Sequence, residues 1–123
     1  MKKREITSHK VNGLNDTLDL FAVGDPGPGG ANHIYDVRPN RGNATGLRIE
    51  FHTGPFSETT PPAGLSNEVL LAILIDRMSG FQSGEFACDE NELALNNLIA
   101  AKDILHKRTR DRLARGVEGT HEK

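Results

Sequence analysis

The chain has 123 residues, a formal net charge of −2 and one cysteine, which suits a single domain, residues 1–123, with one modest core. So small a charge provides no long-range field for DNA, RNA or an acidic membrane, and a lone cysteine excludes an internal disulfide, as is typical of a reducing cytosol. The basic start Met1–Arg4 precedes no apolar run, so it predicts no signal peptide. The longest apolar run, Val69–Ile75, is far shorter than the ~20 residues of a membrane span.

The first half, residues 1–58, has a β-rich pattern. Asn12-Gly13 favours positive φ and predicts a hairpin turn, which residues 14–16 can lengthen. Alternation then predicts a strand over 18–22, and a second one follows at 33–37. The clearest alternation runs from Leu47 to Thr53 and ends at Gly54-Pro55. Together with Gly/Pro-rich loops at 24–30 and 39–46, these segments predict a small antiparallel sheet of about four strands.

The second half, residues 65–116, is predicted to be helical after a boundary at Thr59–Gly64. Ser66 is a candidate N-cap, and Gly80 is expected to end this first helix. Between them, Val69–Met78 is apolar on nearly every side, which is typical of a helix that is buried all round or packs against a partner.

A second, long helix is predicted to follow a short loop. Asp89 and Glu92 resemble a capping box, no Gly or Pro interrupts residues 90–115, and Gly116 closes the helix before a tail, 117–123. At 1.5 Å per residue this helix is ~39 Å long. It exceeds what a small sheet can cover, so one end should project or pair with another chain. The predicted fold class is α+β, with the sheet first and the two helices after it.

The end of the long helix is basic: from Lys102 to Arg115 there are six Lys or Arg residues against two Asp. The ordinary interpretation is a solvated helix C-terminus that complements the helix dipole. Asn91 likewise suits a local cap, and Phe81 and Phe86 suit a core. The alternative is that these residues bind a ligand.

Several short motifs resemble a family of small bacteriophage proteins, the first type of Thoeris anti-defence sponge, over about residues 50 to 120, whereas the first half matches only as a β-rich pattern. The motifs are Phe51–Pro55, Asn67–Leu71, Ile75–Arg77, Gly80–Gln82, Phe86–Cys88, Glu90-Asn91, Ala94-Leu95, Arg108-Thr109, Arg112 and Gly116–Thr120. The resemblance implies a protein of the host bacterial cytoplasm that sequesters a cyclic nucleotide immune signal without cleaving it.

The resemblance also implies a pocket at a subunit interface, in which a Phe stacks on a base, an Asn lies near it and Arg side chains hold phosphates. Phe81, Asn91 and Arg108 have the family's spacing, and Phe86 and Arg112 are further candidates for ligand binding. Arginines of the β-rich half should contribute as well, but Arg38, Arg41 and Arg48 cannot be assigned by alignment.

Helix geometry turns this expectation into one about assembly. Asn91 and Arg108 are seventeen residues apart, roughly 25 Å along a helix, so one small ligand can reach both only if two copies pair antiparallel about a two-fold axis. Leu95, Leu98 and Leu105 share a face with Asn91 and Arg112 and would form the dry seam. The expected partners are therefore the cyclic nucleotide and a homodimer or higher homo-oligomer.

The residues predict neither catalysis nor a cofactor. The five histidines and Cys88 show no ligand spacing for a metal, and no nucleophile–base arrangement is readable. Two alternatives stay open: a phage accessory protein whose helices bind a protein partner and no small molecule, and an enzyme acting on nucleotides, which the missing acid–base pair disfavours.

Overall fold

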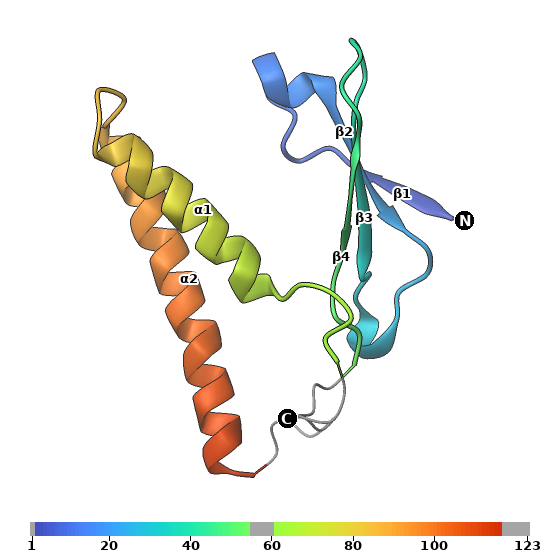
Figure 1. Cartoon of the computed structure of the whole chain (residues 1–123), viewed down its shortest axis with the longest axis vertical. Helices are drawn as coiled ribbons and strands as arrows, with labels where there is room; N and C mark the ends of the chain where they lie inside the picture. The colour runs from blue at the N-terminus through green and yellow to red at the C-terminus, as the bar shows by residue number, and fades with distance from the viewer. Residues whose placement is uncertain (1, 55–60, 117–123) are drawn as a thin grey trace. The chain divides into compact units, whose positions relative to one another are not determined.

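The computed structural model describes residues 2–54 and 61–116 (Figure 1). The chain divides into two compact units, one of Met1–Gly54 with Pro62–Leu65 and the other of Pro55–Pro61 with Ser66–Lys123. The first unit holds a four-stranded antiparallel sheet and the second holds two α-helices. The predicted α+β class, with a long second helix, is confirmed.

The sheet has the strand order β1-β2-β3-β4, and each neighbouring pair is antiparallel. Its strands are β1 (Lys3–Ile6), β2 (Leu18–Val23), β3 (Ile34–Pro39) and β4 (Leu47–Glu50). Strands β2 and β4 begin where the alternation predicts. The prediction that β4 continues to Thr53 is wrong, because regular pairing with β3 ends at Glu50 and Phe51 forms a single parallel bridge with Leu65.

The connection between β1 and β2 is longer than a two-residue hairpin. Gly13 has the positive φ expected of Asn-Gly, +58°, but it opens a 3₁₀ helix, η1 (Gly13–Thr17), which Asn12 precedes in an extended conformation. The Thr17 hydroxyl donates to the Leu14 carbonyl at 2.7 Å and holds this turn. The Asn-Gly pair therefore starts the longer form of the expected turn, with residues 14–16 inside the 3₁₀ helix.

Alternation along the strands separates an apolar face of the sheet from a charged one. On the apolar face, the strand register places Leu20 between Ile6 and Val37. The most buried apolar residues are Ala22 on this face (0% exposed) and Val23 on the opposite face (3%), both at the end of β2. Strand β2, which is paired on both sides, is therefore the centre of this small core.

One buried carboxylate organises the charged face. Asp36 is 4% exposed, and the Arg48 guanidinium donates to both of its oxygens, at 2.8 and 3.0 Å. Lys3 and Arg38 approach the same carboxylate to 3.6 and 3.8 Å. The hydrogen bonds from Arg48, helped by the charges of all three cations, lower the pKa of Asp36 to about 2 against the opposing effect of burial. Three of the four strands are thereby linked through one charge.

Acid should weaken this unit through Asp36. Its pKa in the folded chain lies below the ordinary value of 3.8, so the unfolded chain takes up the proton more readily. The stabilisation is complete above about pH 4 and is lost as the pH falls through 2. The urea midpoint of the wild type, followed by circular dichroism, should fall over this interval more steeply than that of Asp36→Asn, which is already destabilised at neutral pH.

The control for this measurement is Asp25→Asn. The ion pair of Asp25 with Lys2 lies in solvent, with the two side chains 77% and 79% exposed, and such pairs contribute little. This variant should keep the acid dependence of the wild type. The same acid slope in wild type and Asp36→Asn would contradict the role given to Asp36.

Residues 61–65 return to the end of β4 before the first helix begins. The amide of Leu65 donates to the Glu50 carbonyl, and the Leu65 carbonyl accepts from the amide of His52, both at 2.9 Å. A Cβ on Gly64 would lie 2.6 Å from the Glu50 oxygen, so this approach requires glycine. The contact fixes where the chain leaves the sheet unit. Of the predicted boundary, Thr59–Gly64, the first two residues lie outside the described residues.

Helix α1 (Asn67–Gln82) begins as predicted and ends later than predicted. The Ser66 hydroxyl accepts a hydrogen bond from the Val69 amide at 3.2 Å, which confirms the N-cap. The prediction that Gly80 ends the helix is wrong. Gly80 does not have the positive φ of a helix-ending glycine, and its carbonyl accepts from both the amide and the hydroxyl of Ser83, at 3.2 and 2.8 Å. Ser83 thereby closes the last turn.

Helix α2 (Asp89–Ala114) has the predicted length, but its N-cap is Cys88. The Cys88 carbonyl accepts the first helical hydrogen bond, from the Glu92 amide at 3.1 Å, and the Cys88 amide donates to the side chain of Gln82 at 3.0 Å. The predicted cap on Asp89 is therefore displaced by one residue. Gly116 ends the helix as predicted, with φ of +73°; residues 117–123 lie outside the described part of the chain.

The two helices lie side by side as a hairpin (Figure 1). Partly buried positions recur at helical spacing on α1 (Leu71, Ile75, Met78, Gln82) and on α2 (Asn91, Leu95, Leu98, Lys102, Leu105, Thr109), where Arg112 is buried. The face of α2 picked out by the sequence is thus its least exposed face. Within this chain α1 packs alongside α2, and the pairing of α2 with a copy of itself stays a prediction.

This hairpin buries only part of its apolar surface. No described residue of α1 is buried, and Val69, Ile73 and Leu74 are 44%, 50% and 45% exposed. On α2, Leu93 and Ile104 are 64% and 67% exposed. Of the two options given for α1, burial all round is therefore excluded within the described chain. Helix α1, with 16 residues against the 26 of α2, is also shorter by ~15 Å, so the end of α2 extends beyond it.

Substituting Gly80→Ala should stabilise the hairpin. Glycine inside a helix costs roughly 0.5–1 kcal/mol relative to alanine, and a Cβ on Gly80 would meet nothing within 4 Å. We expect a higher thermal midpoint by circular dichroism, with Gly13→Ala as the opposite control, because its φ of +58° disfavours a side chain. A destabilised Gly80→Ala protein would show that another chain packs closely against this glycine.

Candidate functional site

The predicted site residues lie in two groups, at the two ends of α2. Phe81, Phe86 and Asn91 surround the turn that joins α1 to α2, whereas Arg108 and Arg112 belong to the last turns of α2. Asn91 and Arg108 are separated by roughly 25 Å of helix. Within one chain, the structure therefore does not bring the five residues together around one small ligand.

At the turn end, the Phe81 ring is already in contact with a cation. Phe81 is 40% exposed, and the Arg77 guanidinium, one helical turn earlier, lies 5.4 Å from the ring centroid. Such a cation–π pair contributes ~0.5–1 kcal/mol at an exposed site and steadies the ring. Sequence reasoning missed Arg77 as a site residue, although its i, i+4 spacing from Phe81 could have identified the pair.

Phe86 and Asn91 are linked across the turn. The Asn91 side-chain amide donates to the Phe86 carbonyl at 3.5 Å, which is a long hydrogen bond and uses one of the two amide hydrogens of Asn91. The Phe86 ring is 68% exposed, unusual for a large apolar side chain. Asn91 therefore makes a local hydrogen bond across the turn, as its ordinary interpretation expects. Phe86 does not belong to the core of the described chain.

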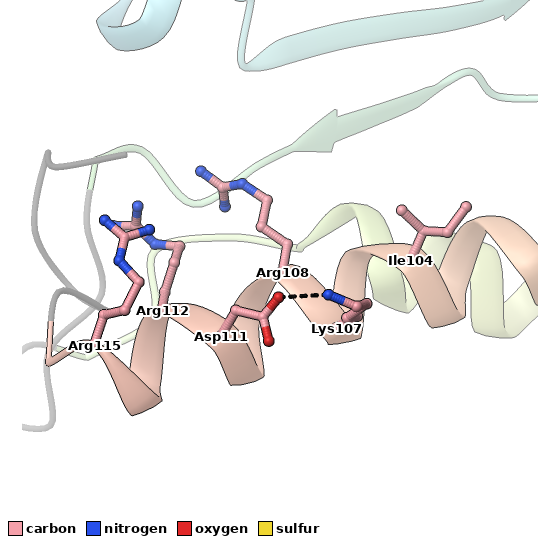
Figure 2. Close-up of a pocket in the computed structure, with 6 residues that line it drawn as sticks. All are labelled: Ile104, Lys107, Arg108, Asp111, Arg112 and Arg115. Carbon is pink, nitrogen blue, oxygen red and sulfur yellow. Dashed lines mark hydrogen bonds and ion pairs between the residues drawn. The ribbon is translucent and has the colours of Figure 1, made fainter.

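At the other end, side chains of α2 form a hollow of about 560 Å³. Its lining residues share one side of the helix, at the spacing i, i+3, i+4, i+7, i+8 and i+11 (Ile104, Lys107, Arg108, Asp111, Arg112, Arg115). Figure 2 shows Arg108, Arg112 and Arg115 extending in the same direction from the helix. Four cations and one carboxylate thus line a space large enough for part of a nucleotide.

The two predicted arginines differ in exposure. Arg108 is exposed and can present its planar fork to phosphate oxygens. Arg112 is only 5% exposed, so its guanidinium lies deeper in the wall of the hollow. The ordinary interpretation, a uniformly solvated basic end, therefore does not fit Arg112.

Lys107 and Asp111 form an ion pair across one turn, with 2.7 Å between Lys107 Nζ and Asp111 Oδ2 (Figure 2). The hydrogen bond from Lys107 lowers the pKa of Asp111, and the charges of Lys107, Arg110 and Arg115 act in the same direction. The carboxylate therefore stays ionised among the cations. Sequence reasoning counted both residues in the basic strip but assigned neither of them a role in the site.

Charge divides α2 along its length. Its first turn carries Asp89, Glu90 and Glu92, and these carboxylates oppose an anion at the helix N-terminus, where backbone amides would otherwise attract one. The C-terminal end carries the cations instead. The basic hollow is therefore suited to anionic groups, and the turn presents exposed aromatic rings.

The arginines of the sheet unit are in a different position. Arg48 donates both of its hydrogen bonds to Asp36, and Arg38 lies within 3.8 Å of the same carboxylate. Arg41 is exposed in the loop between β3 and β4. Two of the three arginines available to the pocket are thus engaged in holding the sheet together.

Among residues 2–54 and 61–116, no group of three or more His, Cys, Asp or Glu side chains is placed to hold a metal ion. In the same residues, no helix combines the length and apolar character that a membrane crossing requires.

Comparison with known proteins finds a similarity to a phage protein. A protein of Bacillus phage SBSphiJ7 named "Thoeris anti-defense 1" is 47% identical to the chain over 75 residues, which are 61% of this chain and 52% of the relative. The chain thus spans about half the length of that relative. No family model matches the chain. The resemblance to the Thoeris anti-defence proteins inferred from the short motifs is confirmed.

Proposed function

We propose that this chain is a phage anti-defence protein that sequesters a cyclic nucleotide immune signal, such as a cyclic ADP-ribose isomer or a cyclic oligonucleotide, without cleaving it. The similarity to a phage protein named for Thoeris anti-defence supports the biological role. The observation that carries the chemistry is the separation of an aromatic turn from a basic hollow at opposite ends of one helix.

The two ends can form one site if two copies of α2 pair antiparallel. A two-fold axis near Ile99 and Ala100, midway between Asn91 and Arg108, places Asn91 of each copy level with Arg108 of the other along the helix axis. The charges of α2 are complementary in this arrangement, since the acidic first turn of one copy meets the basic last turns of its partner.

Apolar surface is available for such a dimer. The face of α2 with Leu95 and Leu98 is its less exposed one, and α1 packs on α2, so the copies would meet through side chains that the hairpin leaves exposed. Leu93 and Ile104, on either side of the proposed axis, share one face of α2 and are 64% and 67% exposed. Burying these residues would stabilise the dimer by ~25 cal/mol for each Å² of apolar surface removed from water.

Each site residue then has a role set by its chemistry. The Phe81 ring stacks on a base, which contributes ~1–3 kcal/mol. Arg77 either stays on the ring or moves away so that the base can stack there. Asn91 can both donate to and accept from a base edge. Arg108 of the partner copy, with Arg112 behind it, binds phosphate oxygens. Affinity comes from stacking and charged hydrogen bonds, and no step of the proposal needs a bond to break.

Calorimetric titration with cyclic ADP-ribose isomers and cyclic oligonucleotides tests the proposal. The wild type should bind at least one of these compounds and return it intact after denaturation, as judged by mass spectrometry. Arg108→Ala should weaken binding by roughly ten- to a hundredfold, the size of a lost charged hydrogen bond, with an unchanged dimer mass. Arg110→Ala is the matched control, because Arg110 is exposed on α2 and does not line the hollow. No heat from any compound with a folded dimer, or a cleaved product, would contradict the proposal.

Mixing two inactive variants tests the shared pocket directly. In a dimer of Asn91→Ala with Arg108→Ala, one site carries both substitutions and the other carries neither. Free exchange of subunits should therefore restore about a quarter of the wild-type binding sites. If the site lies within one chain, the mixture should bind no better than its components.

The exposed apolar side chains of α1 favour a second candidate function, an accessory protein whose helices bind a protein partner. Val69, Ile73 and Leu74 would form its contact surface. In a pull-down from infected cells, Ile73→Asp should then lose a stoichiometric partner, whereas Arg108→Ala should retain it. The sponge function predicts instead that Arg108→Ala weakens nucleotide binding and that Ile73→Asp retains it.

A further inference from the structure

We propose that Asp111 determines specificity in the basic hollow of α2, by accepting a hydrogen bond from a sugar hydroxyl next to the phosphates that the surrounding cations bind. The inference rests on the proposed function in one respect, that phosphates of the ligand enter this hollow. It adds that the hollow recognises a ribose phosphate and discriminates against phosphate alone.

The position of Asp111 supports this role. It lines the same hollow as Arg108, Arg112 and Arg115, and helix geometry places it one turn from both Arg108 and Arg115. Lys107 Nζ, at 2.7 Å, contacts only one of its two oxygens, Oδ2. The side chain is 57% exposed, so the carboxylate is open to a ligand while Lys107 fixes its orientation.

The chemistry of a carboxylate among cations explains the selectivity. An ionised carboxylate only accepts hydrogen bonds, so it repels phosphate oxygens and attracts hydroxyl groups. The same pairing recurs in dinucleotide-binding proteins, where an acidic side chain accepts from a ribose hydroxyl near the bound phosphates. The lowered pKa of Asp111 keeps it in this acceptor form. The Asp111 carboxylate would therefore repel inorganic phosphate, whereas it would accept a hydrogen bond from the hydroxyl of a ribose phosphate.

A plain surface ion pair is the simpler explanation for Lys107 and Asp111, since i, i+4 pairs on helices are common and weak. The two explanations predict different effects of removing the charge of Asp111. A surface pair affects helix stability slightly and has no preference among anions. A hydroxyl acceptor changes the affinities for ribose-bearing and bare phosphates in opposite directions.

The experiment compares two probes that share a pyrophosphate group, ADP-ribose and inorganic pyrophosphate, by calorimetry at fixed ionic strength. Wild-type protein should bind ADP-ribose more tightly than pyrophosphate. In Asp111→Asn, affinity for pyrophosphate should rise several-fold because the repulsion is gone, and affinity for ADP-ribose should fall. The ratio of the two affinities should drop about tenfold, the size of one hydrogen bond to a charged group.

Two controls isolate the effect. Asp103→Asn removes an equal charge from α2 at an exposed position outside the hollow and should leave the ratio unchanged. Circular dichroism should give Asp111→Asn the helix content of the wild type. An unchanged ratio in Asp111→Asn, an equal rise for both probes, or no binding of either probe to wild type would overturn the inference. The proposed function is judged separately by the cyclic nucleotide panel, so either proposal can fail while the other stands.

Discussion

The fixed rise of an α-helix is the constraint on which the rest of this structure depends. Because α2 is one uninterrupted element of 26 residues, its ends are held roughly 39 Å apart, and no rotation of side chains can bring Asn91 to Arg108. The aromatic turn and the basic hollow are therefore either two unrelated surfaces or two halves of a site that another copy completes. The antiparallel arrangement that we propose is based on this length together with the opposite charges of the two ends.

The two units use arginine in different ways. In the sheet, Arg48 binds both oxygens of Asp36, and because Asp36 is buried, the pair serves the fold. On α2, the cations of the hollow outnumber its one carboxylate, and Arg108 is exposed. An exposed arginine on a rigid helix is better suited to a ligand than an arginine that binds a buried carboxylate. Arg108 of α2 is therefore a better candidate for binding phosphate than Arg48 of the sheet.

Local patterns predicted most of the fold. Alternation located the starts of β2 and β4, and the Ser66 cap and Gly116 gave the outer ends of the helical hairpin, because each depends on near neighbours in the chain. The errors arose where contacts that these patterns do not encode decide, whether the partner is distant in the chain or near. Strand β4 stops early because Leu65 returns to pair beside it, α1 passes Gly80 because Ser83 closes the last turn, and Cys88 replaces Asp89 as the cap of α2, where Gln82 binds its amide.

The candidate site was predictable in its residue types but not in its geometry. The motifs identified Phe81, Asn91 and Arg108, yet they could not show that Arg77 covers the Phe81 ring or that Arg112 is far less exposed than Arg108. Asp111 illustrates the reason. In the sequence it is a minor negative charge within a basic strip, whereas in the structure it is a carboxylate oriented by Lys107 beside three arginines.

The exposed apolar surface of the hairpin bears on both candidate functions. A helix that is apolar on nearly every side cannot satisfy that surface against one neighbour, and α1 retains half-exposed Val69, Ile73 and Leu74 after packing on α2. Surface of this kind favours association whatever the biological role, so it cannot distinguish a self-assembling sponge from a partner-binding protein. The polar residues can distinguish the two functions. Apolar association does not require Arg108 and Asp111 to line a common hollow, whereas recognition of a ribose phosphate does.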